Sequence, residues 1–241
     1  MKKFWRIIRT IIIIFFSVTI GLVIIYKWVN PPITPLMIIR CFEQKKEGKP
    51  IRLEKKWVPI EEISPYMIQA VVAAEDNKFT KHFGFDMEAI KYAKEYNKTH
   101  KRKLGGSTIS QQVAKNVFLF PDRSWVRKAF EAYFTVLIEI FWSKERIMEV
   151  YLNVIELGDG IYGVERASEI YFGKSAKRLT KTEAATLAAS LPSPRKWNPH
   201  TQHPRLYKRR DKILSLMNKI GPVELKKTKN DSTVSGLLND L

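Results

Sequence analysis

Residues 75–84 read EDNKFTKHFG, and they follow an apolar stretch, residues 65–74, that reads PYMIQAVVAA. Ser64 is a good N-cap residue and Pro65 suits a first helical turn, so the apolar stretch is predicted to be a helix. Glu75 and Asp76 therefore stand where this helix is about to end. Half burial at that place raises the pKa of a carboxyl group, which suits a general base. A solvated helix end without a catalytic role is the alternative that this stretch alone leaves open.

A second polar stretch, residues 105–112, reads GGSTISQQ. Thr108 and Gln111 have the spacing of a capping box, which by itself accounts for Gln111. Gly105 and Gly106 precede the predicted helix start, where open backbone amides can hold an anion or the hydroxyls of a sugar. The glycine pair alone is weak support for a binding site.

A third stretch places charges on one side of a predicted helix from Trp125 to about Trp142, which Ser124 can cap. Arg127, Lys128 and Glu131 share a face because they lie three or four residues apart. A surface ion pair contributing a few tenths of a kcal/mol is the alternative. The buried side of this helix is predicted to carry Trp125, Ala129, Ala132, Val136 and Ile140.

Most of the remaining chain is also predicted to be helical. The buried stripe Ile147, Val150, Tyr151 and Val154 follows Ser143 at helical spacing. Further helices are expected over residues 86–96, 164–171, 180–191 and 204–220, and a short strand within residues 51–57. The fold class is therefore mainly α.

The N-terminus is expected to anchor the chain in a membrane. Four basic residues lie within residues 1–9, and an uncharged run of mostly Ile, Val, Leu and Phe follows from Thr10 to Tyr26. With its flanks, this run reaches the roughly 20 residues that a spanning helix needs. Lys27 and Trp28 continue as interfacial anchors, which favours an uncleaved span over a cleaved signal peptide. The basic flank places the N-terminus in the cytoplasm and the rest of the chain outside, and it argues against a buried core helix.

Composition narrows the class of partner. The 241 residues include 42 Lys and Arg against 24 Asp and Glu, a net charge of +18. Such a charge implies a polyanionic partner: a nucleic acid, an anionic membrane surface or a phosphate-bearing substrate. Cys41 is the single cysteine, so an intrachain disulfide is excluded. A single cysteine is compatible with either an oxidising or a reducing compartment.

The order of these motifs resembles one enzyme family. The stretches EDxxFxxHxG, GGSTxSQQ and RKxxE are similar to the first three signatures of the peptidoglycan glycosyltransferases, and residues 144–147, 151–153 and 171–174 resemble later ones. The resemblance runs from about Trp57 to Pro222 and is nearest to the monofunctional, membrane-anchored form. It implies a lysozyme-like helical domain with a smaller membrane-proximal lobe, preceded by one transmembrane helix. The expected parts are a cytoplasmic N-terminus (1–6), a transmembrane helix (7–29), a stalk (30–56), a glycosyltransferase domain (57–222) and a polar tail (223–241).

The resemblance also implies roles for individual residues. It makes Glu75 the catalytic base and Glu131 the second catalytic carboxylate. Lys115 and Arg123 match the cations that bind pyrophosphate, although both residues also fit as ordinary surface charges. The remaining residues of the motifs are expected to contact substrate; they are Ser107, Thr108, Gln111, Gln112, Asn116, Arg127 and Lys128. A structural role is favoured for His82, and a local hydrogen bond is the alternative for Asp76.

The implied reaction is the polymerisation of lipid II into glycan strands by inverting glycosyl transfer, with release of undecaprenyl pyrophosphate. The acceptor hydroxyl is a poor nucleophile and needs a base, and the leaving group needs charge compensation. No cofactor or protein-held metal is expected to be obligatory, with room left for Mg or Mn at the pyrophosphate. The expected partners are lipid II, the growing glycan chain, the membrane and other cell-wall synthesis proteins, with no nucleic acid. The expected location is the bacterial inner (cytoplasmic) membrane, crossed once, with the catalytic domain periplasmic.

Three other classes compete with this interpretation. A peptidoglycan-cleaving lytic enzyme shares the fold and a glutamate, but needs neither a membrane span nor cations at its site. Ser193 to Lys196 matches the SxxK of a penicillin-binding protein, but the SxN and KTG partners are absent. A membrane-tethered nucleic-acid module is disfavoured by the outward topology and by the lack of its motifs. The reaction product distinguishes these classes: a polymer from lipid II, cleaved sacculi or a gel shift.

Overall fold

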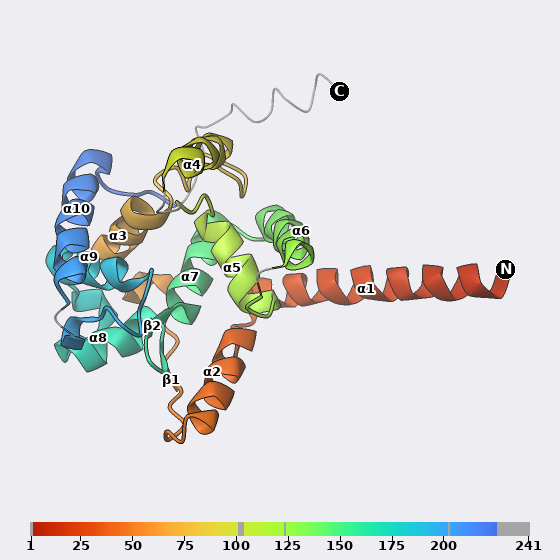
Figure 1. The fold of residues 1–241 in the computed structure, drawn as a ribbon, viewed down its shortest axis with the longest axis horizontal. Helices are drawn as coiled ribbons and strands as arrows, with labels where there is room; N and C mark the ends of the chain where they lie inside the picture. Colours follow the sequence, from red (N-terminus) through yellow and green to blue (C-terminus); the bar gives the residue numbers. More distant parts are fainter. Residues whose placement is uncertain (1, 101–103, 123, 202, 226–241) are drawn as a thin grey trace.

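The computed structural model describes residues 2–100, 104–122, 124–201 and 203–225, and helices dominate this part of the chain (Figure 1). The helices are α1 (Lys2–Trp28), α2 (Pro35–Lys46), α3 (Pro65–Glu75), α4 (Met87–Thr99), α5 (Ile109–Phe118), α6 (Trp125–Phe141), α7 (Lys144–Val154), α8 (Val164–Phe172), α9 (Lys181–Ser190) and α10 (Pro204–Ile220). The strands are β1 (Glu54–Lys55), β2 (Glu156–Gly158) and β3 (Ile161–Tyr162). Short 3₁₀ turns lie at Ile60–Glu62, Ala176–Arg178 and Pro199–Thr201. The mainly α fold behind a long apolar helix is confirmed.

Side-chain caps start the helices where the sequence predicts them. Ser124 and Ser143 accept hydrogen bonds from backbone N–H groups in the first turns of α6 and α7. Ser64 caps α3 in the same way, and Thr180 forms a capping box with Glu183 at α9. Each cap satisfies a backbone donor that the first turn leaves without a partner.

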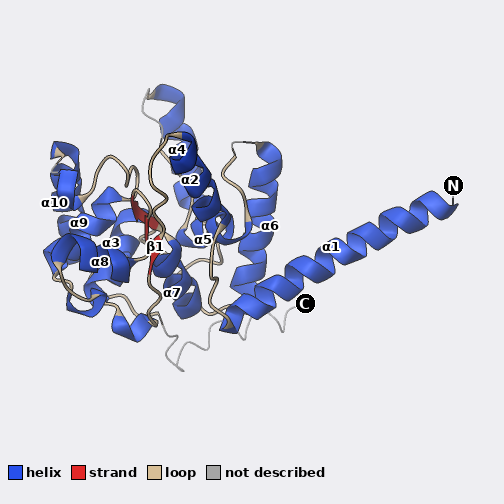
Figure 2. Cartoon of the chain, turned by 90° about the horizontal axis from the view of Figure 1, so that it is seen from below, coloured by secondary structure: helices blue, strands red, loops and turns tan. Residues whose placement is uncertain are grey.

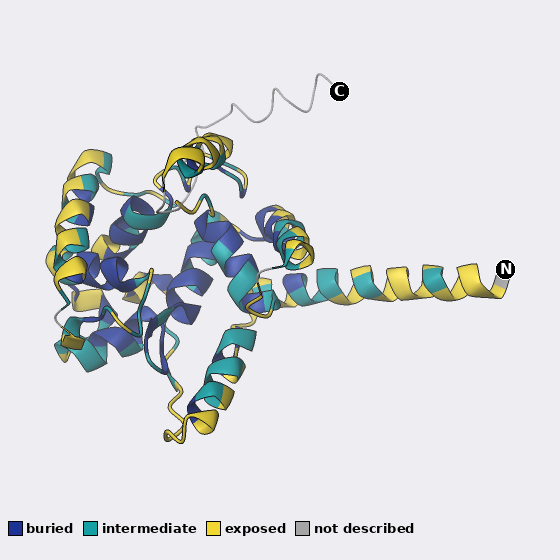
Figure 3. Ribbon diagram, viewed as in Figure 1, coloured by how far each residue is buried: buried dark blue, intermediate teal, exposed yellow. Residues whose placement is uncertain are grey.

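The core surrounds α7 and the small side chains of α9. The predicted stripe of α7, including Ile147 and Tyr151, is fully buried. Residues Ala184 to Ala189 of α9 are buried where α9 packs against α3 and α10. Figure 3 shows this buried centre against the exposed outer end of α1. Alanine at these positions allows three helices to approach closely, which places the end of α3 beside α10.

A small sheet, red in Figure 2, lies among the helices. Its strand order is β1-β3-β2. β1 runs parallel to β3, and β2 pairs antiparallel to β3. Gly160 in the turn has φ +69°, and a Cβ there would lie 2.3 Å from the carbonyl oxygen of Arg52. Glycine is therefore required, because the turn is left-handed and packs directly on the segment before β1. The predicted short strand is confirmed as Glu54–Lys55.

α1 is long and apolar enough to cross a membrane, with a mean hydropathy of 2.6 over a window that is only 6 % buried. Its C-terminal half packs against the domain: Trp142 Nε1 donates to the carbonyl of Val23 at 2.8 Å, and the hydroxyls of Thr19 and Tyr133 are 2.7 Å apart. Arg146 donates to the carbonyl of Tyr26 at 2.9 Å. These contacts are consistent with a single-pass anchor that is joined directly to the folded domain.

The segment predicted to be a stalk contains a docked helix, α2. Thr34 is buried and caps it, Pro35 occupies its first position, and Met37 is fully buried. Thr-Pro is a helix-start signal, but the cluster of prolines around it favours a stiff stalk at the membrane. This segment is therefore not only a stalk between the membrane and the domain. Because α2 packs on α5, it is part of the folded domain.

The predicted buried side of α6 is wrong. Trp125, Val136 and Ile140 are 90 %, 40 % and 57 % exposed. The buried side instead carries residues such as Glu131, Phe134 and Ile138. Apolar residues occur on both sides of α6, and α1 packs along this helix. Periodicity could not distinguish the two sides, since an apolar stripe is compatible with either a protein core or the neighbourhood of a membrane helix.

Candidate active site

Glu75 is the last residue of α3, and its side chain is only 18 % exposed. Gln112 Nε2 of α5 donates to Glu75 Oε2 at 3.0 Å, and Arg209 Nη2 of α10 pairs with Oε1 at 2.9 Å. Burial raises the pKa of Glu75 above its usual value, although Gln112, Arg209 and the nearby Lys115 oppose that shift. The predicted half-buried carboxyl group at the end of an apolar helix is therefore present.

Asp76 joins the first motif to the start of α5. Its side chain is 2 % exposed, and its Oδ2 accepts a hydrogen bond from the Ile109 backbone N–H at 3.0 Å. The Asp76 Oδ1 lies 2.9 Å from His82 Nε2. A carboxylate at a helix N-terminus is also favoured by the helix dipole. Asp76 and His82 therefore hold the loop of the first motif against α5, which agrees with the structural role favoured for His82.

Thr108 and Gln111 form the predicted capping box at the start of α5. Thr108 Oγ1 also donates to the carbonyl oxygen of Gly84 at 2.6 Å. Gly84 has φ +78°, and a Cβ there would lie 2.7 Å from Thr135 Cγ2 of α6. The two motifs and α6 are thus packed together through one glycine. The polar groups of Thr108 and Gln111 are buried in these structural contacts.

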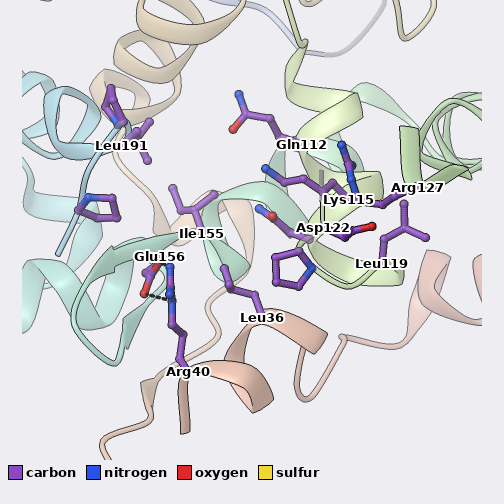
Figure 4. Close-up of a pocket in the computed structure, with 14 residues that line it drawn as sticks. Leu36, Arg40, Gln112, Lys115, Leu119, Asp122, Arg127, Ile155, Glu156 and Leu191 are labelled. Atoms are coloured by element: carbon purple, nitrogen blue, oxygen red, sulfur yellow. Dashed lines mark hydrogen bonds and ion pairs between the residues drawn. The ribbon is translucent and has the colours of Figure 1, made fainter. Parts of the chain in front are cut away.

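A cavity of about 520 Å³ lies beside α5 and is lined by Gln112, Lys115, Asn116 and Arg127, among others. Figure 4 shows Gln112, Lys115 and Arg127 on one side of it. Within the described residues, the Lys115 ammonium makes no hydrogen bond or ion pair. Burial lowers the pKa of Lys115, and the charge of Glu131 opposes that shift. A cation that lacks a protein partner and lines a cavity is suited to an anionic ligand.

Glu131 is surrounded by cations on the buried side of α6. Its side chain is 3 % exposed and forms ion pairs with both Arg127 and Lys128. Lys128 Nζ also lies 3.4 Å from the hydroxyl of Ser107, which is exposed. The surface ion pair considered as the alternative is excluded for Glu131 by this burial. The geometry suits a carboxylate that holds two cations in place.

Comparison with known proteins decides the family. The sequence profile of the family described as transglycosylase matches residues 44–218. The chain belongs to the transglycosylase family. It is 54 % identical over 201 residues to a biosynthetic peptidoglycan transglycosylase of Bdellovibrio bacteriovorus, covering 82 % of this chain and 80 % of that protein. A protein of the same name from Bacteroides thetaiotaomicron is 49 % identical over 229 residues, with 94 % and 92 % covered. One from Caulobacter vibrioides is 52 % identical over 196 residues, with 80 % and 83 % covered.

This transglycosylase brings most of the predicted site residues into two adjoining groups. Glu75 and Gln112 are in direct contact, and Lys115, Asn116 and Arg127 line the cavity with Gln112. Glu131 pairs with both Arg127 and Lys128, and the hydroxyl of Ser107 lies 3.4 Å from Lys128 Nζ. Arg123 lies outside the described residues, so its predicted role stays a prediction. The binding and catalytic roles of the others also stay predictions, since contacts alone do not assign them.

The transglycosylase site also includes residues that the sequence did not suggest. Arg209 reaches Glu75 from α10, at a separation of 134 residues in the chain. Arg40 of α2 and Glu156 of β2 line the cavity and form a two-pronged ion pair with distances of 3.1 and 3.2 Å. The sequence pattern could have indicated Arg209, because it lies three residues after Leu206 and therefore on the side of its helix that is predicted to be buried. Arg40 offered no comparable signal within a segment predicted to be a stalk.

The SxxK-like stretch has a structural explanation. Arg195 pairs with Glu43 at 3.3 Å and with Asp159 at 3.4 Å. Pro194 lines the cavity. The stretch therefore forms a turn that ties α2 to the β2–β3 hairpin, and its likeness to a penicillin-binding motif is a coincidence.

Proposed function

We propose that this chain is a peptidoglycan glycosyltransferase that polymerises lipid II into glycan strands and releases undecaprenyl pyrophosphate. The observation that supports this proposal most strongly is that α5 connects a carboxyl group to a cavity suited to an anion. A buried carboxyl group with a raised pKa, Glu75, is joined through Gln112 to a cavity lined by Lys115, whose ammonium has no hydrogen bond or ion pair among the described residues. A base beside an anion-binding cavity is what glycosyl transfer from a pyrophosphate requires.

Glu75 takes the proton in the proposed reaction. The 4-hydroxyl of the incoming GlcNAc attacks C1 of the MurNAc at the reducing end of the growing chain, and its proton passes to the Glu75 carboxylate. The raised pKa brings the carboxyl group closer to the working pH, where a general base is most effective. Attack from the side opposite the leaving group inverts the α-linked sugar to a β linkage.

The cations stabilise the departing pyrophosphate. The bond from C1 to the pyrophosphate oxygen breaks, and that oxygen keeps the electron pair and gains negative charge. Lys115 and Arg127 line the cavity in which this charge would develop, and Asn116 can donate a hydrogen bond to it. Cations fixed before the reaction stabilise such charge without reorganisation. Glu131 keeps Arg127 and Lys128 in position, and Arg123 is the further cation that the motif assigns to this role.

A divalent cation is not assigned a step. Among the described residues, no group of three or more His, Cys, Asp or Glu side chains is placed to hold a metal ion. A Mg or Mn ion bound at the pyrophosphate oxygens would supply further charge compensation for the leaving group.

The membrane helix and the net charge suit a lipid-linked substrate. α1 keeps the domain next to a bilayer, and the charge of +18 attracts an anionic lipid headgroup. The basic N-terminus is assigned to the cytoplasm and the domain to the outer face of the inner membrane.

The test is polymerisation of labelled lipid II by the purified full chain, with glycan products separated on a gel. Glu75→Gln keeps the size of the side chain but cannot take a proton. Removing a general base typically costs about 10²- to 10⁴-fold in rate, so polymerisation should fall by at least the lower figure while lipid II binding persists. A folded Glu75→Gln chain that polymerises near the wild-type rate would exclude Glu75 as the base.

Glu131→Gln separates the two carboxylates. It leaves Glu75 intact but removes the charge that holds Arg127 and Lys128, so KM should rise together with the fall in kcat. Equal losses in kcat alone for both variants would give Glu131 a direct chemical role. Release of muropeptides from sacculi, without polymer from lipid II, would instead identify a lytic enzyme.

A further inference from the structure

α10 places a cation on its buried side. Leu206, Ile213 and Met217 are almost completely buried and form the apolar stripe of this helix. Arg209 lies three residues after Leu206 and four before Ile213, so it falls on the same stripe. A charge on a buried stripe is costly unless it has a partner, which directs attention to the group that Arg209 contacts.

That partner is the carboxylate of Glu75. Arg209 Nη2 lies 2.9 Å from Glu75 Oε1, and Arg209 Nε is buried with no hydrogen-bond partner among the described residues. Within the described part of the chain, Glu75 is the one carboxylate that pairs with this guanidinium. α10 is itself held on α3, because Gln69 Nε2 donates to the carbonyl oxygens of Met217 at 2.8 Å and Gly221 at 2.6 Å. Packing therefore fixes the position from which Arg209 reaches the end of α3.

The other groups around Glu75 leave Arg209 as its direct counter-charge. From α5, Gln112 is neutral and donates to Oε2, while Lys115 acts on Glu75 through charge without a hydrogen bond. From α7, the hydroxyl of Tyr151 donates to Gln112 Oε1 at 3.4 Å. Burial keeps this phenol neutral by raising its pKa well above the usual value.

The remaining neighbours supply no second direct cation. Asp76, next along the chain, adds a negative charge that is hydrogen-bonded to His82. α9 presents buried alanines to α3 and α10, and its charged residues are engaged elsewhere: Lys181 with Asn218, and Glu183 with Lys174. In the described residues, Arg209 is thus the cation in hydrogen-bond contact with the proposed base.

We propose that Arg209 is a positioning residue that orients the Glu75 carboxylate and keeps it ionised inside a buried site. Burial favours the neutral acid, which cannot accept the acceptor's proton, and the guanidinium counteracts that preference. Arg209 holds one carboxylate oxygen and Gln112 the other, so the plane of the carboxylate is set from two helices. This inference rests on the proposed function, since it assigns Arg209 to the base of that reaction.

The experiment is the pH dependence of lipid II polymerisation by the full chain, with kcat and KM measured for each variant. The rate requires ionised Glu75, so it falls as the pH drops through the pKa of that carboxyl group. An opposite charge in contact lowers a carboxyl pKa by about 1–3 units, so Arg209→Met should move the acidic limb upward by about that much. The loss in kcat should be largest at low pH and should shrink as the pH rises. Arg209→Lys, which retains the charge, should restore most of the limb's position.

Arg210→Met is the matched control. Arg210 is the neighbouring residue, but it pairs with Asp211 at 2.7 Å and lies over the ring of Tyr207 at 5.0 Å. Its profile should coincide with that of the wild type. A second readout without turnover is the carboxyl infrared band of labelled glutamate, with Glu75→Gln used to assign the band of Glu75. This band should titrate at higher pH in Arg209→Met.

The outcomes separate the two proposals. If the wild type makes no polymer from lipid II, the proposed function fails. If the wild type and Arg210→Met polymerise, and Arg209→Met shows lower activity with an unchanged acidic limb and an unchanged Glu75 band, the function stands and the positioning role is wrong. If Arg209→Met does not fold, Arg209→Gln takes its place under the same criteria.

Discussion

Asp76 provides the most direct test of how the site is assembled. Its buried carboxylate accepts hydrogen bonds from the backbone N–H of Ile109 and from His82 Nε2, at 3.0 and 2.9 Å. Asp76→Ala removes the acceptor for both and leaves two buried donors without partners. Each hydrogen bond to a charged group is worth about 1.5–3 kcal/mol, so the expected loss is about 3–6 kcal/mol. That is a large part of the roughly 5–15 kcal/mol that typically separates folded from unfolded protein.

Asp76→Asn should cost about half as much or less. Its side-chain oxygen can still accept from Ile109, and its amide can donate to His82 Nε2 if the ring proton moves to Nδ1. In the wild type, Nδ1 is buried and has no hydrogen-bond partner within the described part of the chain. The rate of polymerisation should nevertheless fall, because the start of α5 positions Gln112 against Glu75.

The assay is thermal unfolding of the full chain in detergent, followed by circular dichroism at a fixed scan rate. For a chain of this size, 1 kcal/mol corresponds to about 2–4 °C, so Asp76→Ala should lower the midpoint by at least about 6 °C. Glu88→Ala is the control, since its side chain is 83 % exposed, and it should leave the midpoint nearly unchanged. A midpoint for Asp76→Ala within about 1 °C of the wild type would show that this carboxylate does not join the two motifs.

Three further predictions concern packing, binding and topology. Gly84→Ala should lower the free energy of unfolding by about 2–4 kcal/mol, because a strained φ of +78° is combined with a contact of 2.7 Å between the new Cβ and Thr135. Gly48→Ala is the control, since Gly48 has φ +69° but nothing within 4 Å. It should cost only the backbone strain of about 1–2 kcal/mol in the same unfolding assay. Lys115→Met should weaken inhibition of polymerisation by free pyrophosphate about 10- to 100-fold, and an unchanged inhibition constant would remove Lys115 from the anion site. A cysteine added to the tail of a Cys41→Ser chain should react with a membrane-impermeant maleimide in cells whose outer membrane is permeabilised; labelling that requires disruption of the inner membrane would reverse the proposed topology.

Local signals in the sequence predicted the parts of the site that neighbouring residues build. The Ser64–Pro65 start and the apolar run after it place Glu75 at the end of a helix, and Thr108 and Gln111 start the next one with a capping box. Caps and helical periods depend on contacts within about four residues, so they are readable along the chain. The same local pattern identified the ion pairs of Glu131 with Arg127 and Lys128.

Tertiary structure decided which helices meet and which sides they bury. Arg209 reaches Glu75 only because the alanines of α9 let α3 and α10 pack together, and Arg40 enters the cavity only because α2 docks on α5. The buried side of α6 was predicted wrongly, since its apolar residues occur on both sides and α1 packs along it. Which side of a helix becomes buried depends on which distant segments compete for the same apolar surface. The hydrophobic effect is non-directional, so the apolar residues of a helix do not specify their packing partner. Local motifs therefore determine which charged and polar residues the site contains. The packed fold determines the geometry that brings Glu75, the cations and the cavity together.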